Sequence, residues 1–360
     1  DVATESFHGG LFAHAGGSCV RAEAGPLRGF LLRASGEERT RDQQALDAVL
    51  ARHADGHALS LVEIGGACLL LVVNGVNGQV SLLNDRFARH PLYYRQANGE
   101  FSFASEPGAL LAVSGAQREL DAQAIYDYVF FHCIPAPRTI YRGIAKLEPA
   151  TLLHWDGAAI ALDSHWRPQF AGHDDGVDSL APQLLAALEL AVAERARPGC
   201  GAFLSGGLDS STVAGMLKRG SGAARTFTIG FDAEGYDESA YARLASRHFG
   251  TEHHEYFVTP ADVLESLPRI AAHYGEPFGN SSVLPTYHCA RFAREHGVDM
   301  MLAGDGGDEL FAGNTRYTEQ QKFELYFSFP AVLRNLLEGG YRLLPWLNHL
   351  PVTGKGARYI

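Results

Sequence analysis

The sequence predicts a chain of two domains, a β-rich α+β domain followed by an α/β domain with a doubly wound parallel sheet. Residues 7–113 consist mainly of short apolar stretches separated by turn residues, which is typical of a β-rich domain with few helices. From Leu180 onward, short apolar strands alternate with amphipathic helices, which implies parallel strands joined by right-handed crossovers. Pro168–Asp178, rich in glycine, histidine and aspartate, lies between the two patterns. We therefore expect domains at residues 1–167 and 178–360.

Four stretches of the amino-terminal domain are expected to form strands. They are Phe7–His14, Gly65–Val73, Gln79–Leu83 and Phe101–Ala104. Arg41–His53 is expected to form a helix, because Leu46, Val49 and Leu50 recur at helical spacing. Gly143–Trp155 is expected to add another hairpin. The result is a mainly β domain.

Strands and helices are expected to alternate in the carboxy-terminal domain, after an opening helix at Leu180–Ala196. The expected strands are Gly201–Leu204, Thr226–Phe231, His253–Val258 and Val298–Ala303. The expected helices are Ser210–Lys218, Glu238–Phe249, Ala261–Tyr274 and Pro285–His296. Ligands of such sheets bind beyond the carboxyl ends of the strands. Two glycine-rich loops are expected at that edge.

Length and composition limit the class of protein. A chain of 360 residues with 46% apolar residues is long enough for two domains that each bury a core. The formal charge of -11 argues against a non-specific nucleic-acid binder, whose surface is normally basic. The sequence shows no signal-peptide pattern and no membrane-spanning apolar run, and its five cysteines form no C-x-x-C pair. We expect a cytoplasmic protein with reduced thiols, without nucleic-acid or membrane partners.

The first glycine-rich loop has the features of a phosphate-binding loop. Gly206 and Gly207 let backbone amides close around phosphate oxygens, and the helix that begins at Ser210 directs its free amides to the same point. Ser205 and Ser210 add hydroxyl donors. Asp209 would repel a bare phosphate, so it indicates a bridging divalent cation. The loop has no lysine and no Walker pattern, which favours the binding of a pyrophosphate leaving group.

The second loop, Gly304–Glu309, combines three glycines with three carboxylates directly after a predicted strand. Carboxylate oxygens are typical ligands of Mg²⁺. Both loops are expected at the same edge of one sheet. We therefore predict that Asp209 and one aspartate of the second loop bind Mg²⁺.

Four segments of the carboxy-terminal half together resemble the synthetase domain of the asparagine synthetase family. They are Ser205–Ser211, Thr226–Phe231, Glu276–Phe278 with Ser281-Ser282, and Gly304–Glu309 with Phe311. The resemblance implies an ATP pyrophosphatase domain, similar to the adenine nucleotide α-hydrolases. It implies an ATP site at Leu204, Ser205, Gly206, Gly207, Asp209, Ser210, Ile229, Gly230 and Gly304. It further implies Mg²⁺ at Asp209 and Asp308, a role in acyl transfer for Asp305, and substrate contacts at Glu276, Ser281 and Ser282.

The amino-terminal half resembles the glutaminase domain of the same family, an Ntn-hydrolase-like β-sandwich. Asn84–Phe87, Pro91–Tyr94 and Phe103–Glu106 carry this resemblance. The family uses an amino-terminal cysteine as nucleophile, but residue 1 is aspartate and the first cysteine is Cys19. Asn74-Gly75 is similar to part of the family's oxyanion hole, yet its position predicts a hairpin turn. We expect this half to keep the fold without hydrolysing glutamine, and thus to have no glutaminase nucleophile.

The resemblance implies a ligase that forms carbon–nitrogen bonds with ATP and Mg²⁺. A carboxylate attacks the α-phosphorus of ATP and gives an acyl-adenylate, which ammonia or an amine then converts to an amide with release of AMP. Three outcomes stay open: an asparagine-synthetase-like enzyme that uses aspartate or a related carboxylate, an intramolecular amide former like β-lactam synthetases or lasso-peptide cyclases, and a non-catalytic nucleotide-binding scaffold. A homodimer is also left open. We expect the chain to continue beyond Ile360 in its complete form.

Five further residues admit two interpretations. His248, His253 and His254 do not follow a zinc-binding spacing, so a structural role is favoured over a metal site. Arg138 and Lys146 lie in the connection between the domains. They face either the nucleotide or a substrate carboxylate, or else they form ordinary ion pairs.

Overall fold

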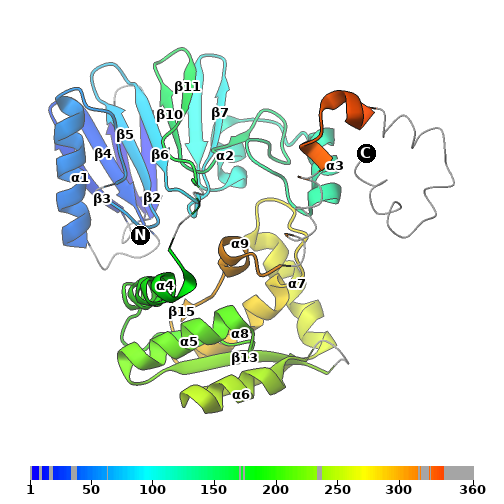
Figure 1. Cartoon of the computed structure of the whole chain (residues 1–360). Coiled ribbons are helices and arrows are strands. Elements are labelled where there is room, and N and C mark those ends of the chain that lie inside the picture. The colour runs from blue at the N-terminus through cyan, green and yellow to red at the C-terminus, as the bar shows by residue number, and fades with distance from the viewer. Residues whose placement is uncertain are drawn as a thin grey trace. The chain divides into compact units, whose positions relative to one another are not determined.

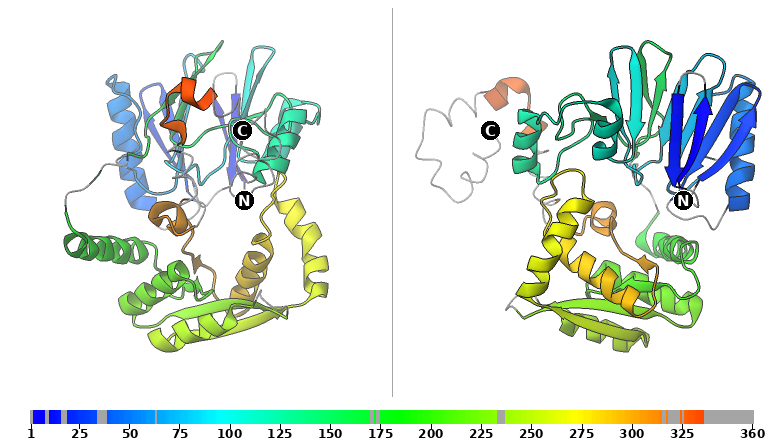
Figure 2. Two further views of the ribbon diagram at one scale, coloured as in Figure 1. Left: turned by 45° about the vertical axis from the view of Figure 1, so that its right-hand side comes forward. Right: turned by 180° about the vertical axis from the view of Figure 1, so that it is seen from behind.

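The computed structural model describes residues 2–7, 10–15, 19–33, 39–62, 64–169, 172, 175–232, 237–314, 317, 324 and 326–335. The chain forms two compact units, shown in Figures 1 and 2. Unit 1 comprises residues 1–174 and 261–284, and unit 2 comprises residues 175–260 and 285–360. Each unit contains its own buried apolar clusters.

Unit 1 is built on a six-stranded antiparallel sheet with strand order β11-β10-β6-β5-β4-β3. Its strands are β3 Cys19–Ala24, β4 Leu27–Leu32, β5 Leu69–Asn74, β6 Val80–Asn84, β10 Thr151–Trp155 and β11 Ile160–Ser164. A second sheet, of order β8-β7-β9, contains β7 Tyr93–Ala97, β8 Glu100–Ala104 and β9 Ala145–Lys146. The remaining hairpin pairs β1 Val2–Phe7 with β2 Gly10–Ala15. Unit 1 is therefore an antiparallel-sheet domain.

Both faces of the six-stranded sheet are covered. Leu70 on β5 belongs to the cluster of helix α1 (Arg39–Ala54), whose Leu50 is fully buried. The next residue, Leu71, points to the opposite face and shares a cluster with Tyr94 of β7. Successive strand residues point to opposite faces, so a strand buried on both sides becomes continuously apolar. Figure 1 shows α1 along this sheet.

The helix expected at Arg41–His53 is confirmed as α1. The turn expected at Asn74-Gly75 is also confirmed, because it joins the paired strands β5 and β6. The side chain of Asn74 accepts from the Val76 amide across 3.0 Å, a local hydrogen bond that stabilises the turn.

Two strand predictions for unit 1 are wrong. Phe7–His14 is not one strand, because β1 ends at Phe7 and β2 begins at Gly10. Gly143–Trp155 is not a hairpin, because β9 pairs with β7 whereas β10 pairs with β6 and β11. A turn that includes Ala150, at a φ of +52°, separates the two strands. The alternation of apolar residues locates strands but does not show which strands pair.

Besides α1, three helices lie in the described part of unit 1. They are α2 Pro107–Ser114, α3 Ala122–Phe131 and α7 Pro260–His273, the last of which belongs to unit 1 from Ala261 onward. The helices α2 and α3 were not expected from the sequence. The helix α7 was expected at Ala261–Tyr274 and is confirmed.

Unit 2 contains a four-stranded parallel sheet of order β14-β13-β12-β15. Its strands are β12 Gly201–Phe203, β13 Arg225–Phe231, β14 Glu252–Val258 and β15 Met301–Leu302. Its helices are α4 Val177–Ala193, α5 Leu208–Ser221, α6 Ser239–Phe249, α8 Val283–Glu295, which belongs to unit 2 from Pro285 onward, and the short α9 Gly307–Phe311. The strands and helices predicted for this half are found in the predicted order, except that the helix expected at Ala261–Tyr274 belongs to unit 1.

The strand order of unit 2 makes the sheet doubly wound. The chain moves outward from β12 through β13 to β14 and then returns to place β15 on the other side of β12. Leu217 of α5 and Ala242 of α6 belong to one apolar cluster, and Cys289 and Ala293 of α8 belong to another with Phe227 of β13. The direction of winding reverses between β12 and β15. Ligands of open α/β sheets bind at such a switch point.

A polar cluster joins α6 to the sheet of unit 2. The guanidinium of Arg243 donates to both carboxylate oxygens of Glu255, with two contacts of 2.8 Å. The same carboxylate lies 3.2 Å from Nε2 of His253, and Nδ1 of that ring lies 3.0 Å from the Thr226 hydroxyl. Burial lowers the pKa of His253 below its ordinary value of 6.5, although the Glu255 carboxylate opposes the effect.

This cluster predicts a pH dependence of stability. Because the pKa of His253 is lowered in the folded chain, the unfolded chain binds its proton first as the pH falls. The stabilising contribution of neutral His253 is therefore complete above pH 6.5 and is lost as the pH falls below that value. Between pH 5 and 7.5, the melting temperature of His253→Gln should depend less steeply on pH than that of the wild type. The exposed His248 supplies the control, His248→Gln, and an equal change in both variants would contradict the prediction.

The hydrogen bond from Arg243, more than any other cause, lowers the pKa of Glu255. A carboxylate with a lowered pKa loses its stabilising contribution only below its ordinary value of 4.5. The two titrations therefore occupy different pH ranges, and above pH 5 the change caused by His253→Gln reflects His253 and not Glu255.

Candidate active site

The first glycine-rich loop begins where β12 ends, and hydrogen bonds to β13 fix its start. The amide of Leu204 donates to the carbonyl of Phe227 across 3.0 Å. The carbonyl of Leu204 accepts from the hydroxyl of Thr228. Both Leu204 and Thr228 are buried. The chain therefore leaves the sheet in a defined direction.

Two serine hydroxyls close this loop onto the first turn of α5. Oγ of Ser205 lies 3.0 Å from Oγ of Ser210, which also accepts from the Ser205 amide across 3.2 Å. The amide of Gly207 donates to Oγ of Ser205 across 3.3 Å. Gly207 is the N-cap of α5, and no side chain caps this helix. Uncapped amides at the positive end of the helix dipole favour an anion.

Glycine is required at position 206 for two separate reasons. Gly206 has a φ of +86°, a conformation that L-residues with a side chain rarely adopt. A side-chain carbon at this position would also lie 2.5 Å from the amide nitrogen of Ala242 and 2.5 Å from Cβ of Tyr241. Both residues belong to α6. The loop therefore packs closely on the beginning of a neighbouring helix.

The second loop lies directly against the first, as predicted. The strand β15 pairs in parallel with β12, so the segments that follow them leave the sheet side by side. A side-chain carbon at Gly304 would lie 2.8 Å from Cβ of Asp209, and one at Gly307 would lie 2.5 Å from its carboxylate carbon. The half-buried Asp209 thus occupies space that only glycines leave open. The expectation of two loops at one sheet edge is confirmed.

The carboxylates of the second loop lie near its surface. Asp305 and Asp308 are exposed, on either side of Gly306 and Gly307. The carboxylate carbon of Asp308 lies 3.3 Å from the place of a side-chain carbon at Gly313. In the part of the chain that the structure describes, no cluster of three or more histidine, cysteine, aspartate or glutamate side chains is arranged to hold a metal ion.

The residues expected near adenine lie on β13, the strand next to β12. Ile229 is half-buried and Gly230 is buried. A side-chain carbon at Gly230 would lie 2.5 Å from the aromatic ring of Phe257 on β14. Both residues come near the carboxyl end of β13, the end from which the two loops also leave their strands.

The three residues expected to contact the substrate belong to unit 1. Glu276 forms an ion pair with Lys146, with 2.7 Å between Oε2 and Nζ. Ser281 and Ser282 are exposed and directly precede α8. The other cation of the connection, Arg138, pairs with two aspartates, Asp121 and Asp127, at 3.1 and 3.2 Å. The ion-pair interpretation therefore holds for both Lys146 and Arg138.

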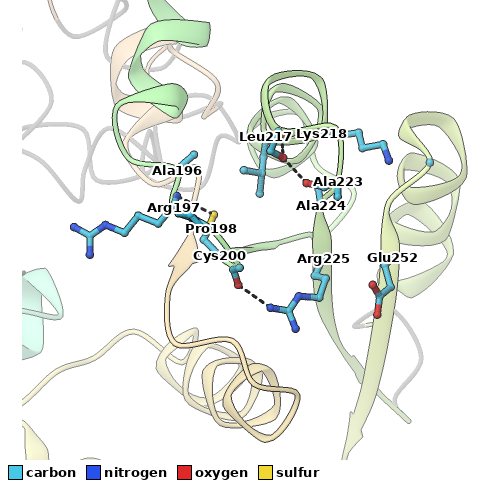
Figure 3. A pocket seen from close by; sticks show the side chains of 13 residues that line it. Ala196, Arg197, Pro198, Cys200, Leu217, Lys218, Ala223, Ala224, Arg225 and Glu252 are labelled. Carbon is cyan, nitrogen blue, oxygen red and sulfur yellow. Dashed lines mark hydrogen bonds between the residues drawn. The ribbon is translucent and has the colours of Figure 1, made fainter. Parts of the chain in front are cut away.

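A cavity of about 680 Å³ lies at the opposite end of the parallel sheet (Figure 3). Arg225 and Glu252, at the amino ends of β13 and β14, line it together with Lys218 from the last turn of α5. The guanidinium of Arg225 is occupied by the carbonyls of Gly199 and His296, at 2.7 and 2.9 Å. The carbonyl end of a helix disfavours an anion. The loops, not this cavity, therefore form the nucleotide-binding candidate.

Several residues that shape the site were not among those predicted from the sequence. Gly307 makes room for the Asp209 carboxylate, and Tyr241 and Ala242 support Gly206. Thr228 fixes the start of the first loop. The alternation Thr226-Phe227-Thr228 on a buried strand was a usable signal for Thr228, because a buried hydroxyl requires an acceptor. No local pattern indicated the contact between the first loop and α6.

The fold and the loops define a class of protein with two parts, an antiparallel-sheet domain of the amidotransferase type and a parallel-sheet domain of the asparagine synthase type. Residues 36–166 match the family model "Glutamine amidotransferase domain", and residues 183–353 match the family model "Asparagine synthase". The chain belongs to the asparagine synthetase family, with a glutamine amidotransferase domain on its amino-terminal side.

Several curated proteins are similar to this chain. Asparagine synthetase [glutamine-hydrolyzing] 1 of Bacillus subtilis is 29% identical over 79% of this chain and 45% of its own length. Putative asparagine synthetase [glutamine-hydrolyzing] 2 of Methanocaldococcus jannaschii is 32% identical over 76% of this chain and 54% of its own length. Amidase chyE of Penicillium rubens is 25% identical over 69% of this chain and 40% of its own length. The chain spans about half the length of these relatives or less.

The described helices give no sign of a membrane-spanning segment. Within the ranges that the structure describes, no helix combines the length and the apolar character that a bilayer crossing requires.

Proposed function

We propose that this protein is an ATP-dependent, AMP-forming amide synthetase that activates a carboxylate as an acyl-adenylate for attack by ammonia or an amine. One observation carries the proposal. The loops that follow β12 and β15 leave the sheet at its switch point, where Asp209 packs against Gly304 and Gly307 beside the uncapped amino terminus of α5. Membership of the asparagine synthetase family supports the same reaction class.

The first loop is proposed to hold the phosphates of ATP. The amides of Gly206 and Gly207 and the hydroxyls of Ser205 and Ser210 supply donors at the amino terminus of α5. These hydroxyls bond to each other in this structure, so a phosphate oxygen would replace one neutral contact by a charge-assisted one. Leu204 and Gly304 would border this site, and Ile229 and Gly230 would lie against the adenine.

Mg²⁺ fits the carboxylates at this edge of the sheet. Asp209 and Asp308 offer oxygen ligands, which this ion prefers, and the glycine at position 307 lets the Asp209 carboxylate lie against the second loop. We propose these two aspartates as the protein ligands of Mg²⁺. When bound, the ion would neutralise charge on the phosphates and on the departing pyrophosphate.

The reaction that we propose needs positioning more than covalent chemistry from the protein. A substrate carboxylate oxygen forms a bond to the α-phosphorus while the bond to pyrophosphate breaks. An amine nitrogen then attacks the activated carbonyl, and AMP leaves with the electron pair. Asp305, exposed at the turn of the second loop, is proposed to take the proton that the nitrogen loses. The loop amides stabilise charge that develops on phosphate oxygens.

The ligase activity can be tested by ATP–pyrophosphate exchange with a panel of carboxylates that includes aspartate and larger amino acids. Exchange with at least one carboxylate is expected, because adenylate formation is reversible. A nucleotide-binding scaffold would exchange with none of them. Dependence on aspartate would favour asparagine synthesis, whereas dependence on a larger amino acid would favour an intramolecular amide former.

We further propose that the amidotransferase domain hydrolyses no glutamine. Its buried cysteines, Cys19 and Cys68, are 6% and 0% exposed. Burial raises the pKa of the Cys68 thiol to about 11, which disfavours the nucleophilic thiolate. The third cysteine, Cys133, is exposed and lies two residues after the end of α3.

This second proposal predicts that the intact protein releases no glutamate from glutamine. Glutamate is measured by a coupled dehydrogenase assay, with ammonia as the alternative nitrogen source in the amide-forming reaction. Amide formation that requires ammonia or a substrate amine is expected. Release of glutamate in step with amide formation would contradict the proposal.

A further inference from the structure

The carboxylate of Glu276 accepts three hydrogen bonds from protein donors in unit 1. Oε2 accepts from Nζ of Lys146 across 2.7 Å and from the Tyr93 hydroxyl across 3.1 Å. Oε1 accepts from the backbone amide of Ile140 across 3.0 Å. Nζ of Lys146 also donates to the carbonyl of Ile134 across 3.2 Å. The side chain of Glu276 is only 10% exposed and that of Lys146 only 22%.

These contacts leave Glu276 poorly suited to bind a substrate. A substrate amine that approached the carboxylate would have to compete with Lys146 for a half-buried negative charge. The Tyr93 hydroxyl keeps its proton and remains a donor, because burial and the neighbouring Glu276 carboxylate both raise the pKa of that phenol. Removal of one partner destabilises a protein much more when the ion pair is buried than when it is exposed, because the remaining buried charge is left unpaired.

The segment around Glu276 contacts the rest of unit 1 at two more points. A side-chain carbon at Gly275 would lie 2.6 Å from Cγ of Pro107, at the start of α2. The amide of Gly279 donates to the carbonyl of His132 across 2.9 Å. Residues 275–279 are therefore held by α2, by the end of α3 and by the connection that follows it. Ser281 comes two residues after the last of these contacts.

We propose that Glu276 is a positioning residue whose ion pair with Lys146 fixes the backbone of residues 275–282, and through it the place of Ser281 and Ser282. The inference rests on the proposed function, together with the substrate contacts that the family resemblance implies for these two serines. Glu276 and Lys146 lie 130 residues apart in the chain. The amidotransferase-type part thereby helps to shape a segment that the asparagine synthase family model covers. Glutamine hydrolysis is not needed for this role.

Four variants separate anchoring from direct substrate contact. Lys146→Met and Glu276→Gln each remove one charge, and the double variant removes both without leaving an unpaired buried charge. The matched control is Arg142→Met. Arg142 lies on the same connection as Lys146 and pairs with Glu119, but both side chains of this pair are more than half exposed. ATP–pyrophosphate exchange is measured against carboxylate and ATP concentrations. Hydrogen–deuterium exchange of the amides of residues 275–282 is measured in parallel.

Anchoring predicts that Lys146→Met and Glu276→Gln act alike. Each should raise the KM for the carboxylate by roughly tenfold and leave the KM for ATP within about twofold, because the substrate segment is displaced while the nucleotide loop is not. The amides of residues 275–282 should exchange about tenfold faster in both variants. The double variant should be no worse than either single variant, since one interaction is lost in all three. Arg142→Met should resemble the wild type.

Two results would overturn the inference. If Glu276→Gln raised the KM for the carboxylate while Lys146→Met behaved like Arg142→Met, Glu276 would contact the substrate directly. Unchanged amide protection in Lys146→Met would show that the ion pair does not hold the segment. If the wild-type protein showed no ATP–pyrophosphate exchange with any carboxylate, the proposed function itself would be wrong. The amide measurement would then decide the anchor independently of activity.

Discussion

Asp209→Ala is expected to reduce ATP–pyrophosphate exchange by about 10²- to 10³-fold, the usual loss when one group that stabilises developing charge is removed. The carboxylate of Asp209 lies in the first turn of α5 and against Gly307 of the second loop. Asp209 thus brings the first loop into contact with the second. Without it, the proposed Mg²⁺ site loses a ligand, and the negative charge on the phosphates is compensated less well.

The fold should survive this substitution. Asp209 is only half-buried, and alanine is favourable inside a helix. Circular dichroism and thermal unfolding should therefore resemble the wild type. The matched control is Asp178→Ala, in the first turn of α4, where the loss of a similarly placed carboxylate should leave exchange unchanged. Retained exchange in Asp209→Ala, or an equal loss in both variants, would contradict the metal role.

The second large effect is expected from Gly206→Ala. The added methyl group would lie 2.5 Å from the amide nitrogen of Ala242, and the backbone at φ +86° would carry a further penalty of about 1–2 kcal/mol. The loop can accept the methyl group only by moving away from α6. Its amides would then no longer face the phosphates, so exchange should fall by roughly 10²-fold, mainly through a higher KM for ATP.

Gly220→Ala provides the comparison for Gly206→Ala. Gly220 lies in the last turn of α5, and a side-chain carbon there would meet nothing within 4 Å. This substitution should stabilise the helix by a few tenths of a kcal/mol and leave exchange unchanged. Exchange and nucleotide titration followed by intrinsic fluorescence would check both variants. Wild-type affinity for ATP in Gly206→Ala would show that the first loop does not bind the phosphates as proposed.

The parallel-sheet unit was largely predictable from sequence. Each of its strands and helices has a short apolar pattern of its own, and right-handed crossovers allow few ways to connect them. The two loops were predictable for the same reason, because a run such as Gly304–Glu309 cannot serve packing. The expectation that they share one sheet edge followed from parallel strands, whose carboxyl ends lie together.

The antiparallel unit was less predictable. The stretch Gly143–Trp155 contains two apolar segments separated by turn residues, which suggested a hairpin, yet β9 and β10 belong to different sheets. Strand pairing depends on contacts between distant segments, which local alternation does not encode. The mainly apolar stretch Pro107–Ser114 forms the helix α2, which was not recognised from the sequence. A short apolar stretch does not distinguish a strand from a helix without its surroundings.

The sequence by itself determined the chemistry that we propose for the candidate site: glycines that open the backbone, hydroxyls and amides suited to bind an anion, and carboxylates suited to Mg²⁺. These properties belong to single residues and to their order along the chain. The tertiary structure alone decided which glycine receives the Asp209 carboxylate, which helix supports Gly206, and that Glu276 is paired with Lys146. Such contacts arise when packed elements bring distant residues within a few ångströms, and their energies depend on burial, which the order of residues does not record.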